Sequence, residues 1–485
     1  MAVPDETLVH ALRSACADPR RAAAPALRDD ARSLSYAEVH AAAGRLAGQL
    51  RAAGVREGER VALSMQRSAD LALALLGTLA AGACPCPMEP GLGAEEAARR
   101  HRLARIDWTL HDAAHADDAD LQHVPGEHRL AYEALPAADA FWAEHLPPEA
   151  HGLLLFTSGS SGAPKGVLQN HRGMLCNARG VIERTGLVAS DRLLHVMPLY
   201  HTNGVNNQLI APLLAGASVM LAGRFKAEDM PALMARHRPT LVTGVPTMFS
   251  RMLAHEFAPR ALADLRMLRC GSAPITEELH RRIEAKFGLA LVLSYGLSEA
   301  TCTSVMNPPT QRRIGSVGRP LAGQQVFLQD GEICISGPAL MSGYLEDGSE
   351  GRPRPMGEVL HTGDLGRMDE DGYLYITGRI KEVIIRGGEK LAPSLIEEAL
   401  AGVPGVLACC VVGRPDADLG EVPVAFVVRH PSPAGAALDA AHLSDALKKK
   451  LARIYLPAEY RFLESLPENA VGKVDRKRLK AVLAG

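Results

Sequence analysis

Features that would point to a membrane, a secretory route or a nucleic acid are missing from this 485-residue chain. No apolar stretch reaches the roughly 20 residues that a membrane-spanning helix needs. The first residues, Met-Ala-Val-Pro-Asp-Glu, lack the basic and apolar regions of a signal peptide. The 53 Lys and Arg residues balance 55 Asp and Glu residues, and a net charge of −2 creates no overall field toward nucleic acid or an anionic membrane. We therefore expect a cytoplasmic protein that neither spans a membrane nor binds nucleic acid.

Cysteines in the spacing of a metal site or a disulfide framework are also absent. The nine cysteines are an odd number and are scattered along the chain. The pairs Cys84/Cys86 and Cys409/Cys410 lie in apolar segments without nearby histidines, which favours core packing over a redox or metal role. Thiols of this kind are typical of a reducing cytoplasm.

The length and the alternating patterns predict more than one domain. A chain of 485 residues is too long for one simple core. From Leu193 onward, apolar strands alternate with helical stretches, which predicts right-handed crossovers and a parallel sheet. A small antiparallel sheet or barrel is expected at about 302–378, with a hairpin turn at Asp330-Gly331, and an α+β unit follows. The expected strands cover 193–197, 218–222, 240–244, 266–270 and 290–294, and the expected helices lie near 205–214, 227–237, 246–255 and 275–287.

Two further segments have local signals. Capping boxes are expected to start helices at Ser35-Tyr-Ala-Glu38 and at Ser394-Leu-Ile-Glu397. Residues 90–150 have poor periodicity, so we expect surface helices and loops there around one short strand near Ile106–Leu110.

A glycine- and hydroxyl-rich loop follows the apolar run Leu153–Phe156, which is typical of a buried strand. Glycines let backbone N–H groups turn toward a ligand, hydroxyls add donors and a lysine adds positive charge, which together suit a polyphosphate. The Walker spacing is absent. A flexible Gly/Ser linker is the alternative, but the strand in front and the Pro-Lys-Gly sequence favour a nucleotide-binding loop. Its residues are Thr157, Ser158, Gly159, Ser160, Ser161, Gly162 and Lys165.

Unusual polar residues follow several of the expected strands. Ligands of parallel sheets bind at the carboxyl ends of strands, so the loops that carry His201 and Glu299 should converge. A lone His is more often structural than functional and a lone Glu is usually solvated, but a place just past a strand end makes a functional role about as frequent as a structural one. A carboxylate such as Glu299 suits Mg²⁺ beside phosphates, and Tyr295 offers a flat face for a base. Asp364 could accept both hydroxyls of a ribose, or it could be a turn residue after a glycine.

Taken together, these residues resemble the adenylate-forming enzyme superfamily, in particular its acyl-CoA synthetase and AMP-dependent ligase branch. The resemblance spans about Leu34 to Leu479. It rests on motifs that occur in the family's order: Thr157–Gly166, Tyr295–Glu299, His361–Asp364, Gly378–Glu382 and Pro467–Arg476.

The resemblance implies an α/β fold with a large N-terminal AMP-binding domain, residues 1–379, and a small, mobile α+β C-terminal domain, residues 380–485. The large domain would hold two doubly wound α/β subdomains and a small β-barrel, at about 302–378. The implied activity is ATP-dependent formation of an acyl-adenylate with release of pyrophosphate, followed by thioester formation with coenzyme A. The implied cofactors are ATP, Mg²⁺ and coenzyme A.

The resemblance also implies residue roles. Lys473 would be the lysine of the adenylation step, Lys381 the hinge of the C-terminal domain, and His201 the residue that gates the acyl pocket. Thr157 and Glu299 would position Mg²⁺. The implied catalytic residues are Lys473, Glu299, His201 and Lys165. The implied nucleotide and coenzyme contacts are Thr157, Ser158, Gly159, Ser160, Ser161, Gly162, Lys165, Gly271, Ser272, Ala273, Tyr295, Gly296, Ser298, Asp364, Arg379, Lys381, Gly388 and Lys473.

The sequence around the expected acyl pocket bears on the choice of acid. Amino-acid-activating relatives usually carry an Asp for the α-ammonium there, and the segment 200–207 has no acid, which favours a carboxylic acid without an α-amine. Asn203 and Asn207 could face the pocket and accept a small or polar acid, or they could be helix-cap residues. Arg312 or Arg313 could pair with a second carboxylate of a diacid, or could lie on a surface loop.

Three whole-chain alternatives stay open at this point. An acyl-CoA synthetase is favoured, a ligase that loads a carrier-protein phosphopantetheine comes next, and an inactive nucleotide-binding homologue is third. The intact Lys165, Glu299, Asp364 and Lys473 argue against the third. A monomer or a homodimer is expected.

Overall fold

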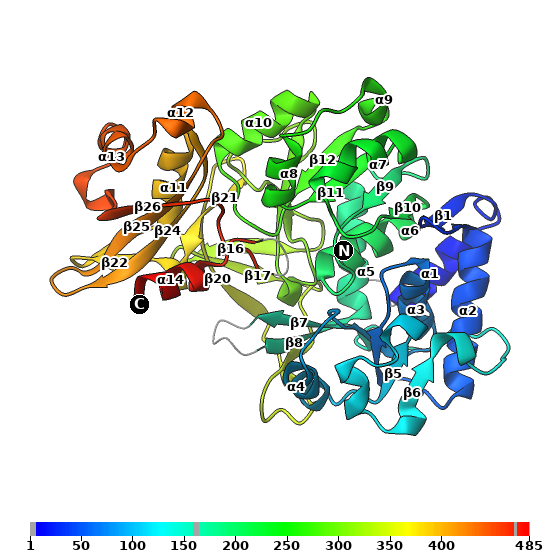
Figure 1. Cartoon of the computed structure of the whole chain (residues 1–485). Helices are drawn as coiled ribbons and strands as arrows, with labels where there is room; N and C mark the ends of the chain where they lie inside the picture. Colours follow the sequence, from blue (N-terminus) through cyan, green and yellow to red (C-terminus); the bar gives the residue numbers. More distant parts are fainter. Residues whose placement is uncertain (1–5, 159–163, 470–472, 485) are drawn as a thin grey trace.

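The computed structural model describes residues 6–158, 164–469 and 473–484, and it shows a large domain beside a smaller one that ends the chain (Figure 1). The order of α/β elements confirms the predicted fold class. The boundary at residue 379 stays a prediction. Among the described residues, no helix has the length and apolar character needed to cross a membrane.

A nine-stranded sheet forms the centre of the large domain, and its inner strands are parallel, as predicted. Neighbouring residues of one strand, such as Leu241 and Val242, join two different hydrophobic clusters, so both faces of the sheet are covered. In sheet order the strands are β15 (Arg319–Pro320), β14 (Val305–Met306), β13 (Leu291–Tyr295), β12 (Met267–Cys270), β11 (Leu241–Gly244), β9 (Arg192–His195), β10 (Ser218–Leu221), β1 (Pro25–Arg28) and β2 (Ser33–Ser35).

The strand order reverses at β9. The chain first places β10 on one side of β9 and then crosses to place β11, β12 and β13 on the other side. Such a switch point opens a crevice at the carboxyl ends of the two central strands, where open α/β sheets bind their ligands. The topology therefore places a candidate site at the ends of β9 and β11.

The helices of the large domain pack against its sheets and against one another (Figure 1). The predicted capping box of Ser35 and Glu38 is present at the start of α2. The helix expected near 205–214 begins as a π-helix and continues as α6. The helices are α1 (Leu8–Ala17), α2 (Tyr36–Ala52), α3 (Ala69–Ala80), α4 (Ala94–Ala104), α5 (His171–Thr185), the π-helix η5 (Asn203–Ile210), α6 (Ala211–Ala215), α7 (Met230–His237), α8 (Pro246–Met252), α9 (Pro259–Leu262) and α10 (Glu277–Phe287).

Two smaller sheets flank the central one. The first is parallel and contains β6, a short strand that the sequence analysis missed because its three residues are half-buried or exposed and have no apolar run. The second contains the strand in front of the phosphate loop. The strands are β4 (Cys84–Pro87), β3 (Arg60–Ser64), β5 (Trp108–His111) and β6 (Arg129–Ala131) in one sheet, and β19 (Arg354–Pro355), β18 (Gly343–Leu345), β8 (Pro164–Asn170) and β7 (His151–Ser158) in the other.

The phosphate loop joins two antiparallel strands, β7 and β8. Lys165, which was placed in the loop from the sequence, lies in β8 directly opposite Thr157 of β7. Directly opposite residues of a ladder project from the same face of the sheet. The pairing corrects the earlier placement and puts the lysine and the threonine on one face.

The predicted antiparallel sheet with its turn at Asp330-Gly331 is confirmed by the pairing of β16 with β17. Its four strands are β16 (Gln325–Gln329), β17 (Glu332–Ser336), β20 (Val359–Met368) and β21 (Leu374–Arg379).

The smaller domain packs helices on a mixed sheet. The capping box predicted at Ser394 and Glu397 is wrong: Ala392 caps α11, the Ser394 hydroxyl donates to the carbonyl of Thr377, and Glu397 pairs with Arg476. The elements are β22 (Ile384–Arg386), β23 (Glu389–Leu391), α11 (Pro393–Ala401), β24 (Val406–Asp416), β25 (Gly420–Arg429), α12 (Pro433–Ala436), α13 (Ala440–Lys448), β26 (Glu459–Leu463) and α14 (Arg476–Ala484).

Candidate active site

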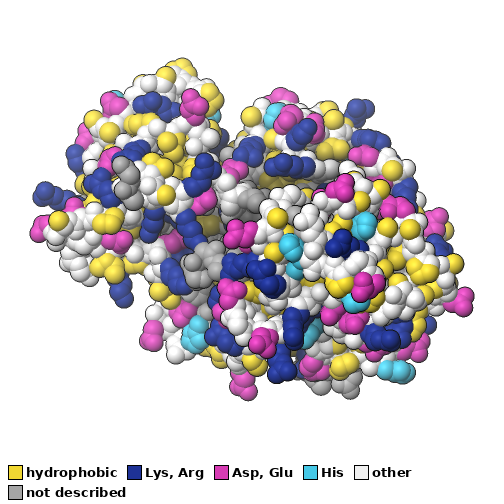
Figure 2. Space-filling model, turned by 60° about the horizontal axis from the view of Figure 1, so that its bottom comes forward, with side chains coloured by type: hydrophobic (Ala, Val, Ile, Leu, Met, Phe, Trp, Pro, Cys, Tyr) yellow, Lys and Arg dark blue, Asp and Glu magenta, His cyan; other side chains and the backbone are white. Residues whose placement is uncertain are grey.

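The site lies where the carboxyl ends of the central strands face the smaller domain. Figure 2 shows the two lobes meeting across a furrow, with Lys and Arg side chains on both sides of it. Gly271 and Ser272 follow β12, and Tyr295 ends β13. Glu299 lies in the short helix η7 (Ser298–Ala300) beyond β13. The predicted convergence of these loops therefore agrees with the strand order.

Asp364 is the most buried carboxylate of this region, with 2% of its surface exposed. The hydroxyl of Tyr295 donates to its Oδ2 at 2.7 Å, and Nε of Arg379 forms an ion pair with its Oδ1 at 2.7 Å. Burial and the carboxylate of Asp364 together raise the pKa of Tyr295, so the phenol stays protonated and keeps donating. Three residues predicted to contact the nucleotide thus form one connected group.

Glu299 and Lys165 are joined through a residue that the sequence analysis missed. The hydroxyl of Tyr344, in β18, donates to Oε1 of Glu299 at 2.8 Å. Nζ of Lys165 lies 5.0 Å from the centre of the Tyr344 ring and 3.1 Å from Oε2 of Glu346. The ammonium of Lys165 holds the pKa of the Glu346 carboxyl below its usual range. Nothing in the linear order of the chain links these residues, because the contact depends on the pairing of β18 with β8.

Lys473 of the smaller domain reaches this group. Burial lowers the pKa of its ammonium, the positive charge of Arg379 lowers it further, and the carboxylates of Asp364 and Glu299 oppose the shift. The pKa of His201 falls to about 4, mainly because the ring is buried and also because of the charge of Lys473. These mutual effects mean that Lys473 lies within electrostatic reach of residues from four separate segments of the large domain.

A buried polar network lies behind His201. The π-helix η5 is buried along its whole length, and π-helical turns often occur at functional sites. Nδ2 of Asn207 donates to Oδ1 of Asn203 at 3.0 Å, so the two side chains lie on one face of the helix. Thr202 takes the cap position, and whether the two asparagines face the acyl pocket stays a prediction. Nδ2 of Asn207 also reaches Oγ1 of Thr303 at 3.0 Å. The network links the helix to the segment after Glu299.

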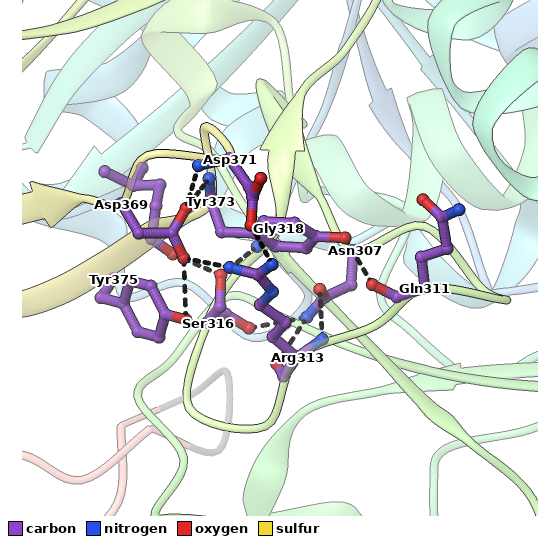
Figure 3. A network of polar contacts seen from close by, with 10 residues as sticks. Asn307, Gln311, Arg313, Ser316, Gly318, Asp369, Asp371, Tyr373 and Tyr375 are labelled. Carbon is purple, nitrogen blue, oxygen red and sulfur yellow. Dashed lines mark hydrogen bonds and ion pairs between the residues drawn. The ribbon is translucent and has the colours of Figure 1, made fainter.

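Neither Arg312 nor Arg313 is free to bind a substrate diacid. Arg312 forms two short contacts with Glu284, at 2.5 Å and 2.6 Å. Arg313 pairs with Asp369 at 2.5 Å and with Asp371, and its guanidinium stacks on Tyr373 (Figure 3). Both arginines therefore lie in a loop where they bind carboxylates of the protein itself, which agrees with the alternative that they do not bind a diacid.

The structure does not test the roles of several residues that were predicted to contact the nucleotide or coenzyme A. Gly159, Ser160, Ser161 and Gly162 lie outside the described residues, and Ser158 is described only as the end of β7. Lys381 lies in the turn η8 (Ile380–Glu382), and Gly388 lies in the tight turn between β22 and β23. Within the described ranges, neither shares a side-chain hydrogen bond or ion pair with the site. Their roles stay predictions.

The residues present fit a magnesium ion beside phosphates. Glu299 engages only one of its two oxygens in a hydrogen bond from the described residues, which leaves a hard oxygen donor of the kind that Mg²⁺ prefers. Thr157 lies at the end of β7 on the same face as Lys165. A second group with metal-binding side chains, Glu332, Cys334 and His361, lies on β17 and β20.

Comparison with family models agrees with this geometry. Residues 14–345, more than half of the chain, match the model of the AMP-binding enzymes, and residues 395–473 match that of their C-terminal domain. The chain is 37% identical to a sulfoacetate–CoA ligase of Cupriavidus necator, with 93% of each chain covered. It is 35% identical to a feruloyl-CoA synthase of an Amycolatopsis species, covering 93% of this chain and 94% of the relative.

Solved structures give the same result. MatB from Rhodopseudomonas palustris with bound ATP superposes with a TM-score of 0.87 at 28% identity, covering 98% of this chain and 99% of MatB. The o-succinylbenzoate CoA synthetase MenE from Bacillus subtilis, in complex with ATP and magnesium, gives a TM-score of 0.83 at 27% identity, covering 98% of this chain and 99% of MenE. The chain uses ATP, Mg²⁺ and coenzyme A as an AMP-forming acid–CoA ligase, and it belongs to the family of AMP-binding enzymes.

Proposed function

We propose that this ligase activates a small carboxylic acid without an α-amine, and that Lys473, Lys165, Glu299, Asp364 and Arg379 carry the adenylation step. The observation that supports the proposal is the place of Lys473. Its ammonium comes from the smaller domain and lies within reach of Asp364, Glu299 and Arg379 of the large one. The arrangement fits the first half-reaction, in which the two domains close over ATP and the acid.

In that half-reaction two anions must approach each other. An oxygen of the acid's carboxylate forms a bond to the α-phosphorus of ATP, and the bond between that phosphorus and the pyrophosphate oxygen breaks. Glu299 would hold Mg²⁺, whose positive charge would neutralise the phosphate oxygens. Lys165 exchanges Glu346 for the β- and γ-phosphates, and Lys473 donates to the α-phosphate oxygens as they gain charge. Catalysis is then positioning and electrostatics.

Nucleotide binding follows from the buried group around Asp364. Its carboxylate is held by Tyr295 and Arg379, and it faces the ribose, whose hydroxyls donate to its oxygens. Gly271, Ser272, Ala273 and Tyr295 form the adenine pocket, with Gly296 and Ser298 in the adjoining turn. His201 is neutral at physiological pH because its pKa lies near 4, so it gates the acyl side without adding charge.

The second half-reaction needs another arrangement of the domains. The thiolate of coenzyme A attacks the acyl carbon, the thioester forms, and AMP leaves. Lys473 fills the space that the second nucleophile must enter, so the smaller domain rotates about Lys381 between the two steps, bringing the Gly388 turn toward the pantetheine.

Experiments on Lys473 test this assignment. The variant Lys473→Ala should lower ATP–pyrophosphate exchange by about 100-fold or more, while it still converts a supplied acyl-adenylate and coenzyme A to thioester. Lys477→Ala, which changes an exposed lysine in the same region, is the matched control. Equal loss of both half-reactions would overturn the division of labour.

The same assay identifies the thiol acceptor. A carrier protein with phosphopantetheine is offered beside coenzyme A, and exclusive transfer to the carrier would overturn the choice of acceptor. A cytoplasmic enzyme is proposed because both ATP and coenzyme A are drawn from the cell interior. A monomer or a homodimer is proposed, and light scattering at assay concentration tests it.

A further inference from the structure

Arg269 is a buried arginine of the central sheet that none of the steps above uses. It is the third residue of β12, and only 4% of its surface is exposed. A guanidinium at such depth normally pairs with a carboxylate or saturates its donors with carbonyl oxygens, because an unpaired buried charge is costly.

Arg269 has neither a carboxylate partner nor a full set of carbonyl acceptors among the described residues. Nη2 donates to the hydroxyl of Thr303 at 2.7 Å, and Nε makes a long contact of 3.4 Å with the hydroxyl of Ser294. Both acceptors are neutral hydroxyls. Within residues 6–158, 164–469 and 473–484, Arg269 forms no ion pair with any carboxylate. Burial lowers the pKa of Arg269 only to about 10, so the side chain stays charged at neutral pH.

Two half-buried arginines show what a satisfied guanidinium looks like in this protein. Arg67 donates to the carbonyls of Met197, Ala222 and His195 at 2.6 Å to 2.7 Å. Arg184 donates to the carbonyls of three residues near β14 and β15. Among the residues that the structure describes, Arg269 has no comparable set of acceptors, so its charge lacks there the partners that the other two arginines have.

The surroundings of Arg269 connect it to the acyl side of the site. Thr303 accepts from both Arg269 and Asn207, and Asn207 belongs to the π-helix that begins just after His201. Oδ1 of Asn207 has no hydrogen-bond partner among the described residues, and the same holds for Oδ1 of the fully buried Asn177. Buried polar atoms without partners are rare in native proteins. The amide groups of both asparagines donate to Thr303, the residue that also accepts from the guanidinium.

The position along the strand also fits. Arg269 precedes Gly271 by two residues, so its backbone lies roughly 7 Å from Gly271, back along the strand and away from the loop that follows it. The nucleotide is proposed to lie at that loop. A group that contacts Arg269 would therefore lie deeper than the reacting carboxylate, at the far end of a short acyl chain.

We propose that the guanidinium of Arg269 binds a second acidic group of the substrate, a carboxylate or a sulfonate, distal to the carboxylate that is activated. The proposal rests on the proposed function and names the substrate class of the same site: short acids with two anionic groups. The planar guanidinium can donate two parallel hydrogen bonds to either group. An acid with an uncharged distal end would leave the guanidinium unpaired, which gives the site a means of rejecting it.

The test compares dianionic acids with monoanionic counterparts of similar size, whose distal group is uncharged. The wild-type enzyme is assayed with sulfoacetate and succinate, and with propanoate and the monomethyl ester of succinate, by pyrophosphate release and thioester formation. We expect kcat/KM for at least one dianion to exceed that of the monoanions by about 100-fold or more. In Arg269→Met this preference should collapse, chiefly through a raised KM for the dianion, with kcat/KM for the monoanions unchanged or higher. Arg269→Lys should keep part of the preference.

A binding measurement separates a role in recognition from a role in folding. Sulfoacetate or succinate should raise the Tm of the wild type in the presence of ATP and should not raise that of Arg269→Met. Without ligand, the variant should unfold at a temperature no lower than the wild type, because it removes an unpaired charge. A wild type that turns over the monoanions with no preference for dianions would overturn the proposal but leave the ligase assignment intact. Absence of turnover with every acid would count against the proposed function instead.

Discussion

At the scale of single residues, the site is joined by hydrogen bonds between side chains that are far apart in the sequence. Tyr344 and Glu299 lie 45 positions apart and meet at 2.8 Å. A partner that orients a metal-binding carboxylate fixes the direction of its free oxygen, and losing such a partner typically weakens metal binding by 10- to 100-fold. The phenol of Tyr344 is thus a positioning group for Glu299.

The variant Tyr344→Phe should raise the free Mg²⁺ concentration that gives half-maximal ATP–pyrophosphate exchange by about tenfold. The effect should appear in the Mg²⁺ dependence more than in the rate at saturating Mg²⁺, because the carboxylate is still present. Tyr375→Phe removes a comparable hydrogen bond, to Asp369, in the antiparallel sheet and serves as the control. An unchanged Mg²⁺ requirement in Tyr344→Phe would show that Glu299 needs no support.

At the scale of elements, the turn after β13 decides where Glu299 points. Thr301 has a φ of 65° and a ψ of −52°, a strained backbone for a β-branched residue. Its carbonyl accepts from Gln169, Thr202 and Asn206, and these bonds hold the conformation in place. The turn is therefore determined by its surroundings and not by local preference.

Gly296 is required by the same turn. A Cβ at this position would lie 1.9 Å from the carbonyl oxygen of Cys302, a distance that forces the backbone to move. We expect Gly296→Ala to lower the Tm by several degrees and to reduce adenylation far more than its effect on stability explains. Differential scanning calorimetry and pyrophosphate exchange measure the two effects.

The control for this variant is Gly93→Ala. Gly93 has a φ of −64° and open space around its Cβ direction, so the change should leave both the Tm and the exchange rate nearly unchanged. If Gly296→Ala behaved like Gly93→Ala, the turn would have room that its contacts do not indicate.

At the scale of the whole molecule, contacts between the domains stabilise the arrangement that brings Lys473 to the site. Arg251 of α8 pairs with Glu468 of the Lys473 segment at 2.7 Å, and Glu398 of α11 accepts from the backbone N–H of Glu277, at the start of α10. Ion pairs at the surface are worth about 0.2–1 kcal/mol. Even this amount changes a balance between two domain orientations by a few-fold.

The variant Glu468→Ala should therefore slow adenylation about two- to fivefold and leave the conversion of a supplied acyl-adenylate unchanged or faster. Half-reactions measured separately, with Arg251→Ala and the double variant, should show that the two changes are not additive. Arg13→Ala, which breaks an exposed ion pair within the large domain, is the control. Equal effects on both half-reactions would mean that the pair does not discriminate between the two orientations.

Much of this protein follows from its sequence alone. The alternation of apolar strands and helices predicted the parallel sheet, because burial on both faces of a sheet needs continuous apolar runs. The hairpin at Asp330-Gly331 and the cap at Ser35 depend on local chemistry and were predicted for that reason. The motifs from Thr157–Gly166 to Pro467–Arg476, in the order typical of adenylate-forming enzymes, indicated the family.

The tertiary structure decided what depends on contacts between distant segments. Local sequence could not show that Glu397 would pair with Arg476 and so be unavailable to a capping box, or that Lys165 would lie in a strand beside Tyr344. Local sequence also could not show which arginine would be left without a carboxylate partner. Arg312 and Arg313 could each have paired with a second acid group or lain on a surface loop, and both are paired with carboxylates. Arg269, in an apolar strand, is buried without a carboxylate partner among the described residues. A charge acquires its role from the partners that folding brings to it, and those partners are not its neighbours in the chain.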